Sequence, residues 1–119
     1  MALVKRKKSK KTSPLQRSKK LLESEGYTVA IVERWNPWAK VRQDLFGIID
    51  LLAIKPGRTL GVQVTTLSHK QPHIDKIKTS PYFPTLQQAG WTIVLHSWRE
   101  LKDGWKVDLE DFNANNKTN

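Results

Sequence analysis

The alternation of apolar and polar residues divides the first third of the chain into a helix, a strand and a loop. Ser13-Pro14 is typical of a helix start, with serine as the N-cap and proline at the first helical position, and Gly26 can end that helix. Residues 27–32 alternate and are rich in β-branched side chains, which predicts a strand. A loop is expected over 33–41, because an Asn-Pro pair interrupts any β-ladder there.

Two apolar runs in the middle of the chain predict a β-hairpin. Residues 48–54 are apolar nearly throughout, as in a strand buried on both faces, and residues 59–66 follow a Pro-Gly turn. The remaining expectations are a loop over 67–72, a helix over 73–79, a helical turn or two over 82–89, a strand over 91–97 and an optional edge strand over 105–109. This order, α-β-β-β-α-β with an optional last strand, predicts an α/β fold with a mixed sheet flanked by helices.

Basic charge is concentrated at the N-terminus. The net charge is +10, but residues 1–20 carry nine Lys or Arg and no acid, so the other 99 residues sum to +1. We therefore expect a disordered basic arm over 1–13, a folded domain over 14–112 and a polar tail over 113–119. The arm is either a solubilising tail or a nucleic-acid-binding segment. Its candidate nucleic-acid contacts are Lys5, Arg6, Lys7, Lys8, Lys10 and Lys11.

Composition narrows the class of protein. The sequence contains no cysteine, which excludes disulfides and thiolate metal sites and favours an intracellular location. No apolar run approaches the roughly 20 residues of a membrane helix. We expect a cytoplasmic, nucleoid-associated protein without a membrane partner.

Polar residues converge in the predicted hairpin. Asp50 lies near the end of its first strand, and Gln63 and Thr65 share one face of the second, because side chains alternate along a strand. A carboxylate, an amide oxygen and a third polar group suit a divalent metal beside a phosphate. The structural alternatives are a turn cap or salt-bridge partner for Asp50 and ordinary strand positions for Gln63 and Thr65.

This element order, with a carboxylate on the second strand and two polar positions on the third, resembles the PD-(D/E)XK nuclease superfamily over residues 14–98. Its members include restriction-endonuclease-like enzymes, archaeal Holliday-junction resolvases and VRR-NUC domains. The strings from Arg42 to Asp50 and from Gly61 to Thr65 are also similar to small nuclease-like proteins of bacteria and their viruses. The resemblance implies a restriction-endonuclease-like αβββαβ core, Mg²⁺- or Mn²⁺-dependent cleavage of DNA, branched or single-stranded substrates such as junctions and flaps, and an optional homodimer.

Carried over residue by residue, Asp50 matches the superfamily's metal-binding Asp, Gln63 its second acid and Thr65 its catalytic Lys. Gln63 brings no negative charge, and Thr65 has no cation to stabilise a developing phosphorane. The resemblance therefore leaves two gaps. Lys70 in the following loop is the first candidate for the missing cation, and Asp44 and Glu33 are the candidates for the missing carboxylate.

Further basic and aromatic residues lie in the predicted 33–41 loop and just after it. Trp35 and Trp38 stand between basic residues and are expected to contact nucleic acid. Arg42 either clamps a phosphate or pairs with Asp44. His69 and His73 have a zinc-like spacing, but Pro72 between them argues against one continuous helix, and no zinc is expected.

Three classes of function fit these features. The first is a metal-dependent endonuclease, and the second is a catalytically degenerate nucleic-acid-binding protein on the same fold. The third is a protein-interaction subunit whose basic arm binds an acidic partner.

Overall fold

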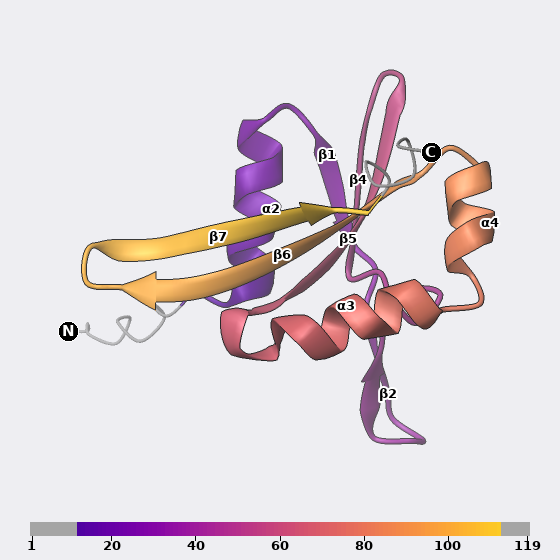
Figure 1. Ribbon diagram of the computed structural model, residues 1–119, viewed down its shortest axis with the longest axis horizontal. Coiled ribbons are helices and arrows are strands. Elements are labelled where there is room, and N and C mark those ends of the chain that lie inside the picture. Colours follow the sequence, from indigo (N-terminus) through magenta and orange to yellow (C-terminus); the bar gives the residue numbers. More distant parts are fainter. Residues whose placement is uncertain (1–11, 113–119) are drawn as a thin grey trace.

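A computed structural model describes residues 12–112 of the chain as a mixed five-stranded sheet with helices packed on it (Figure 1). The elements are α2 (Pro14–Ser24), β1 (Thr28–Ile31), β2 (Arg34–Asn36), β3 (Val41–Gln43), β4 (Leu51–Lys55), β5 (Arg58–Thr66), η2 (Leu67–His69), α3 (Lys70–Thr79), α4 (Phe83–Gln88), β6 (Thr92–Leu101) and β7 (Gly104–Asp111). The predicted basic arm up to residue 11, with its six candidate DNA contacts, and the polar tail 113–119 lie outside the described residues. Within 12–112, no helix is long and apolar enough to cross a membrane.

The strand order of the sheet is β1-β4-β5-β6-β7. Strand β5 pairs with β6 in parallel, and the other three pairings are antiparallel. This confirms the predicted α/β class with a mixed sheet flanked by helices. The predicted β4–β5 hairpin is also confirmed, with Leu51 opposite Val62.

The two faces of the sheet are buried by different helices. On one face, Leu22 of α2 packs in a cluster with Leu51 and Val62. On the other face, Ile77 of α3 and Leu86 of α4 belong to a second cluster, whose remaining members are Ile48, Ile49, Ile93, Leu95 and Phe112. Because neighbours along β5 alternate, Val62 faces α2, and Gln63 is directed to the α3 side.

Helix α2 is fixed to the sheet by a buried polar contact. Its start is as predicted, since the Ser13 hydroxyl accepts a hydrogen bond from the Gln16 amide at 3.1 Å. Within the helix, the Ser18 hydroxyl lies 2.8 Å from His96 Nδ1 and accepts a hydrogen bond from Trp98 Nε1 at 2.8 Å. Burial lowers the pKa of His96 to about 4, so its imidazole is neutral in the folded protein.

The prediction of a loop over 33–41 is wrong, because β2 and β3 form a separate two-stranded hairpin there. The Asn-Pro pair makes the turn of this hairpin. The Asn36 side-chain oxygen accepts hydrogen bonds from the amides of Trp38 (2.9 Å) and Ala39 (3.1 Å), and the Lys40 amide donates to the Asn36 carbonyl at 2.8 Å. Asparagine side chains stabilise turns in this way, so proline is tolerated without breaking the pairing.

Two predicted boundaries also differ. The strand expected from residue 48 begins at Leu51, because the chain before it folds into a turn in which the Gly47 amide donates to the Asp44 carbonyl at 2.9 Å. The helix expected from residue 73 begins at Lys70. Pro72 lies in the first turn of α3. Backbone N–H groups of a first turn have no hydrogen-bond partner within the helix, so the missing N–H of proline costs no hydrogen bond there.

Candidate metal centre

Three carboxylates meet at one end of the β4–β5 hairpin. Glu33 precedes β2, Asp44 follows β3 and Asp50 directly precedes β4, and one oxygen from each lies within 4.8 Å of the others. Oxygen ligands of one Mg²⁺ or Ca²⁺ ion, each about 2.0 to 2.6 Å from it, lie no more than about 5 Å apart. The spacing therefore fits a single divalent cation. Glu33 and Asp44, which the sequence offered as replacements for the missing acid, both join Asp50.

Gln63 supplies a fourth polar group on the neighbouring strand. Its Nε2 donates to Asp50 Oδ2 at 2.8 Å and to Asp44 Oδ2 at 3.1 Å. The side chain is 1% exposed, and its Oε1 has no hydrogen-bond partner among the described residues. Rotating the amide by half a turn would direct this oxygen at the carboxylates, where it could serve as a ligand to a bound cation. The predicted convergence of Asp50 and Gln63 is confirmed.

Asp50 and Asp44 have opposite pKa shifts. Burial and the adjacent Asp44 carboxylate raise the pKa of Asp50 to about 8. Burial also acts to raise the pKa of Asp44, but hydrogen bonds with Asp50, Gln63 and Lys76 hold it below its usual value. Without a cation, Asp50 is therefore mainly protonated at neutral pH, and a bound cation would displace that proton.

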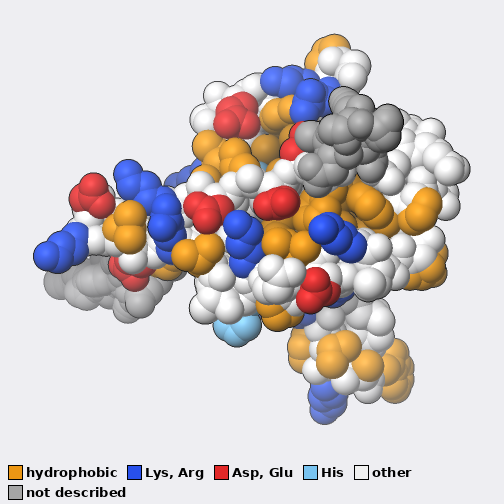
Figure 2. Space-filling model, in the orientation of Figure 1, with side chains coloured by type: hydrophobic (Ala, Val, Ile, Leu, Met, Phe, Trp, Pro, Cys, Tyr) orange, Lys and Arg blue, Asp and Glu red, His pale blue; other side chains and the backbone are white. Residues whose placement is uncertain are grey.

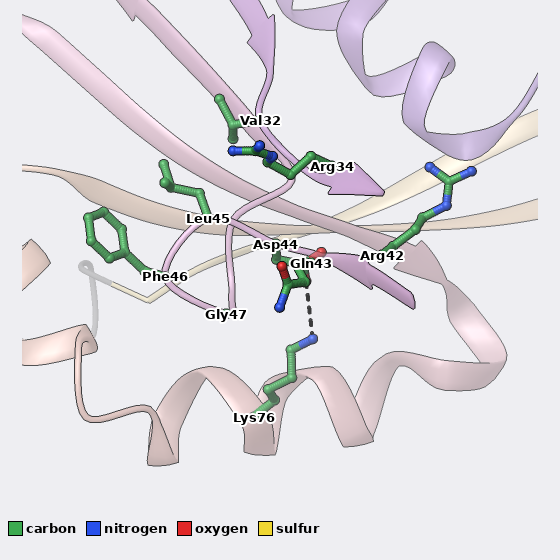
Figure 3. A pocket seen from close by; sticks show the side chains of 9 residues that line it. All are labelled: Val32, Arg34, Arg42, Gln43, Asp44, Leu45, Phe46, Gly47 and Lys76. Atoms are coloured by element: carbon green, nitrogen blue, oxygen red, sulfur yellow. Dashed lines mark hydrogen bonds and ion pairs between the residues drawn. The ribbon is translucent and has the colours of Figure 1, made fainter. Parts of the chain in front are cut away.

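The lysine at this centre is Lys76, which the sequence reasoning missed. Lys76 Nζ reaches up from α3 to lie 3.2 Å from Asp44 Oδ2 (Figure 3). Lys70, the predicted candidate, instead lies 3.9 Å from Asp108 of β7. His69, His73 and Lys76 have the spacing of one helix face, and this spacing could have placed Lys76 near the centre. It indicates a shared face only if the helix starts before Pro72.

The carboxylates lie between two hollows in the surface. Lys76, Asp44 and Phe46 are among the residues lining the first hollow, which Figure 3 shows. Asp50 and Thr65 line the second hollow, together with Glu33, His69 and His73. Thr65 thus faces the candidate centre, as predicted, and brings no cation to it.

The two histidines do not join the carboxylate cluster. His73 Nδ1 donates to the His69 carbonyl at 2.9 Å. His69 Nδ1 lies 3.1 Å from the Thr66 hydroxyl. Within residues 12–112, the single group of three or more close metal-ligand side chains consists of carboxylates alone. Such an oxygen set suits Mg²⁺ or Mn²⁺.

Arg42 contacts a different acid from the one expected. Its guanidinium lies 3.1 Å from Glu33 Oε2, so the alternative in which Arg42 pairs with Asp44 is wrong. The pairing follows from the β2–β3 hairpin, which brings Arg42 of β3 back beside the residue preceding β2. The hairpin also carries Trp35 and Trp38, both exposed.

Comparison with models of known protein families and with curated proteins finds no match to this sequence. Function must therefore be inferred from the chemistry of the centre. The residues present fit a hard divalent cation: three carboxylates at the right spacing, a buried amide oxygen in need of a partner, and a carboxyl proton that a cation can displace.

Proposed function

We propose that this protein is a metal-dependent nuclease that hydrolyses DNA phosphodiester bonds at the centre formed by Glu33, Asp44, Asp50 and Gln63. The observation that carries the proposal is the approach of three carboxylates to within 4.8 Å around a buried amide. When bound there, Mg²⁺ or Mn²⁺ would polarise the scissile phosphate and lower the pKa of an attacking water.

A restriction-endonuclease-like core is part of the proposal. Without the β2–β3 hairpin, the short η2, α4 and β7, the order is α2-β1-β4-β5-α3-β6, which is the αβββαβ order expected of PD-(D/E)XK nucleases. Asp50 directly precedes β4 and Gln63 lies on the adjacent antiparallel β5, which resembles the placement of the Asp and the second acid in that superfamily. A homodimer that cuts two strands symmetrically rests on the same resemblance.

Each protein group has a defined task in this scheme. Asp50 and Asp44 provide negative charge, with Glu33 as the third carboxylate and Gln63 as a neutral oxygen ligand. Lys76 fixes Asp44 through their 3.2 Å contact and brings positive charge to a site where Thr65 has none. Because Lys76 acts through Asp44, it is a positioning residue. The basic arm would attract the DNA backbone in a salt-dependent way.

The test is cleavage by the full chain of plasmid, single-stranded, flap and four-way-junction DNA with Mg²⁺ or Mn²⁺. We expect Asp50→Asn to abolish cleavage. Lys76→Gln should reduce it about 10- to 100-fold, the usual cost of removing a group that orients a metal ligand. Lys70→Gln is the matched control on the same helix and should cut like the parent. If Asp50→Asn cuts as fast as the parent, the assigned centre is wrong.

One observation favours a second function, nucleic-acid binding without cleavage. Gln63 Nε2, Lys76 and the Asp50 proton together satisfy the buried carboxylates without any metal. A nuclease that has lost its activity would keep a centre of this kind, in which the protein's own groups neutralise the carboxylates. This function is favoured if the parent and Asp50→Asn both retard DNA in a gel, neither cuts it, and calorimetry detects no Mn²⁺ binding.

A further inference from the structure

The β2–β3 hairpin is the most exposed apolar feature of the described structure. It projects away from the sheet in Figure 1, and in Figure 2 hydrophobic side chains gather on the same projection, with Lys or Arg at its end. Trp38 at the turn is 92% exposed, and Trp35 on β2 is 55% exposed. More than half of each residue is exposed, so both rings offer aromatic surface to a partner.

The turn holds Trp38 in a defined place. Asn36 caps the Trp38 and Ala39 amides, and its Nδ2 also donates to Gln43 Oε1 at 3.1 Å. Pro37 restricts the backbone just before the ring. The tryptophan is thus presented by an ordered turn, and little conformational freedom of the backbone would be lost when the ring stacks on a partner.

The charge of the hairpin identifies the chemistry of that partner. Residues 34–43 contain Arg34, Lys40 and Arg42 and no acid. An aromatic ring among cations matches a strand of nucleic acid, which offers a flat base next to an anionic phosphate. A base in an intact duplex is stacked on both sides, so the available partner is an unpaired or unstacked base.

The hairpin is also connected directly to the candidate metal centre. Glu33 immediately precedes β2 and Asp44 immediately follows β3. Trp35 and Arg42 are register partners and share a face, and Arg42 contacts Glu33 at 3.1 Å. That face therefore runs from the carboxylates toward the tip. At about 3.3 Å per residue, the three-residue strands of the β2–β3 hairpin span about 10 Å.

We propose that the hairpin stacks on an unpaired base through Trp38 and holds it at a fixed distance from the carboxylates. The preferred substrate is then DNA with a single-stranded segment or a branch point. Phosphates of a stacked strand are about 3.4 Å apart along its axis, and Trp38 lies beyond the three-residue strands, so the cut lies at least about three nucleotides from the stacked base. The cut position rests on the proposed nuclease function, whereas the stacking does not.

Binding tests the stacking without any cleavage. The probe is a flap oligonucleotide with the fluorescent base 2-aminopurine at each unpaired position in turn, with Ca²⁺ or no metal present. Binding of the parent should quench one position, and Trp38→Ala should remove that quenching and weaken binding roughly five-fold or more. Trp38→Phe should retain most of both. Trp105→Ala, which removes a tryptophan on β7 that packs under Arg17, should bind and quench like the parent.

The opposite binding results would overturn the proposal. These are no binding by the parent, equal affinity for flap and intact duplex, or unchanged quenching with Trp38→Ala. A further contradictory result is a parent dimer in sedimentation that Trp38→Ala dissociates while DNA binding stays the same. The hairpin would then be an interface between two copies of the chain.

Cleavage mapping tests the fixed distance. Lengthening β2 and β3 by two residues each should move the cut by about two nucleotides, since each added residue extends the hairpin by about 3.3 Å. A cut that stays in place contradicts the distance. If neither protein cuts, the proposed nuclease function fails, and the fluorescence result still decides the stacking.

Discussion

At the scale of single residues, the Asp50 proton links metal binding to pH. Burial and Asp44 raise the pKa of Asp50 to about 8, so below that pH a cation must displace a proton. We predict that the affinity for Mn²⁺ rises about tenfold per pH unit up to about pH 8 and levels off above it. Calorimetry between pH 6 and pH 9 measures this. A parent affinity that stays constant over the range would contradict the account.

His96 makes a separate contribution to stability. Its pKa is about 4 in the folded protein and near 6.5 when unfolded, so the unfolded chain binds more protons between these values. Stability therefore falls as the pH falls through this window, by about 2 kcal/mol between pH 7 and pH 5. Asp50 acts in the opposite direction, because its pKa is raised, so the two effects must be separated.

Chemical denaturation of the parent and of His96→Gln at both pH values separates them. Asp50 is present in both proteins, and the difference between them reports His96. We expect the parent to lose about 2 kcal/mol more than the variant on acidification. Equal losses would show that His96 is not held neutral by burial.

The sequence could reveal only those site residues whose contacts depend on neighbouring elements of the chain. Asp50 directly precedes β4 and Gln63 lies on its hairpin partner β5, so the hairpin and the alternation of side chains were enough to predict that they converge. The contacts of Lys76 with Asp44 and of Arg42 with Glu33 depend on where α3 begins and on an additional hairpin. The Asn36 turn and the proline-containing first turn of α3 both allowed regular structure where proline suggested loops.

At the scale of elements, the close packing of β4, β5 and β6 supports the centre. A Cβ added to Gly61 of β5 would lie 2.7 Å from Ile49 Cδ1 and 3.1 Å from Ile93 Cδ1, and both isoleucines are fully buried. We predict that Gly61→Ala lowers the free energy of unfolding by about 1 to 3 kcal/mol. Displacement of Ile49 would also disturb its neighbour Asp50 and weaken Mn²⁺ binding.

A compensating substitution makes this prediction specific. Ile49→Val removes the Cδ1 methyl that the new Cβ would strike. The double variant should be more stable than the sum of the two single effects predicts, by about 0.5 kcal/mol or more in a denaturation cycle. Strictly additive losses would mean that the steric contact is not the cause.

At the scale of the whole molecule, the net positive charge and the candidate metal centre belong to different parts of the sequence. Residues 1–12 carry six Lys or Arg, so deleting them lowers the net charge from +10 to +4. We predict that the deletion flattens the dependence of DNA affinity on salt, by about 0.7 to 0.9 in the log–log slope for each phosphate that the arm neutralises. Gel-shift titrations over a range of salt measure the slope. An unchanged slope would exclude the arm from DNA binding.

The fold class followed from the sequence because the buried strands and the capped first helix leave clear periodic patterns. The candidate site was only partly predictable, because Gln63 and Thr65 depart from the acid and lysine of the superfamily that the sequence resembles. The further groups of the candidate centre come from segments distant in the sequence: Glu33 and Asp44 at either end of the β2–β3 hairpin, and Lys76 on α3.

The central claim is that these carboxylates bind a divalent cation, and a crystal soaked in Mn²⁺ tests it most directly. Anomalous scattering locates Mn²⁺ independently of the protein atoms. We predict a peak bounded by oxygens of Glu33, Asp44 and Asp50, with the Gln63 amide turned to present Oε1. A Mn²⁺-soaked crystal at pH 8 or above without a peak there, in which Gln63 Nε2 still donates to both aspartates, would contradict the account.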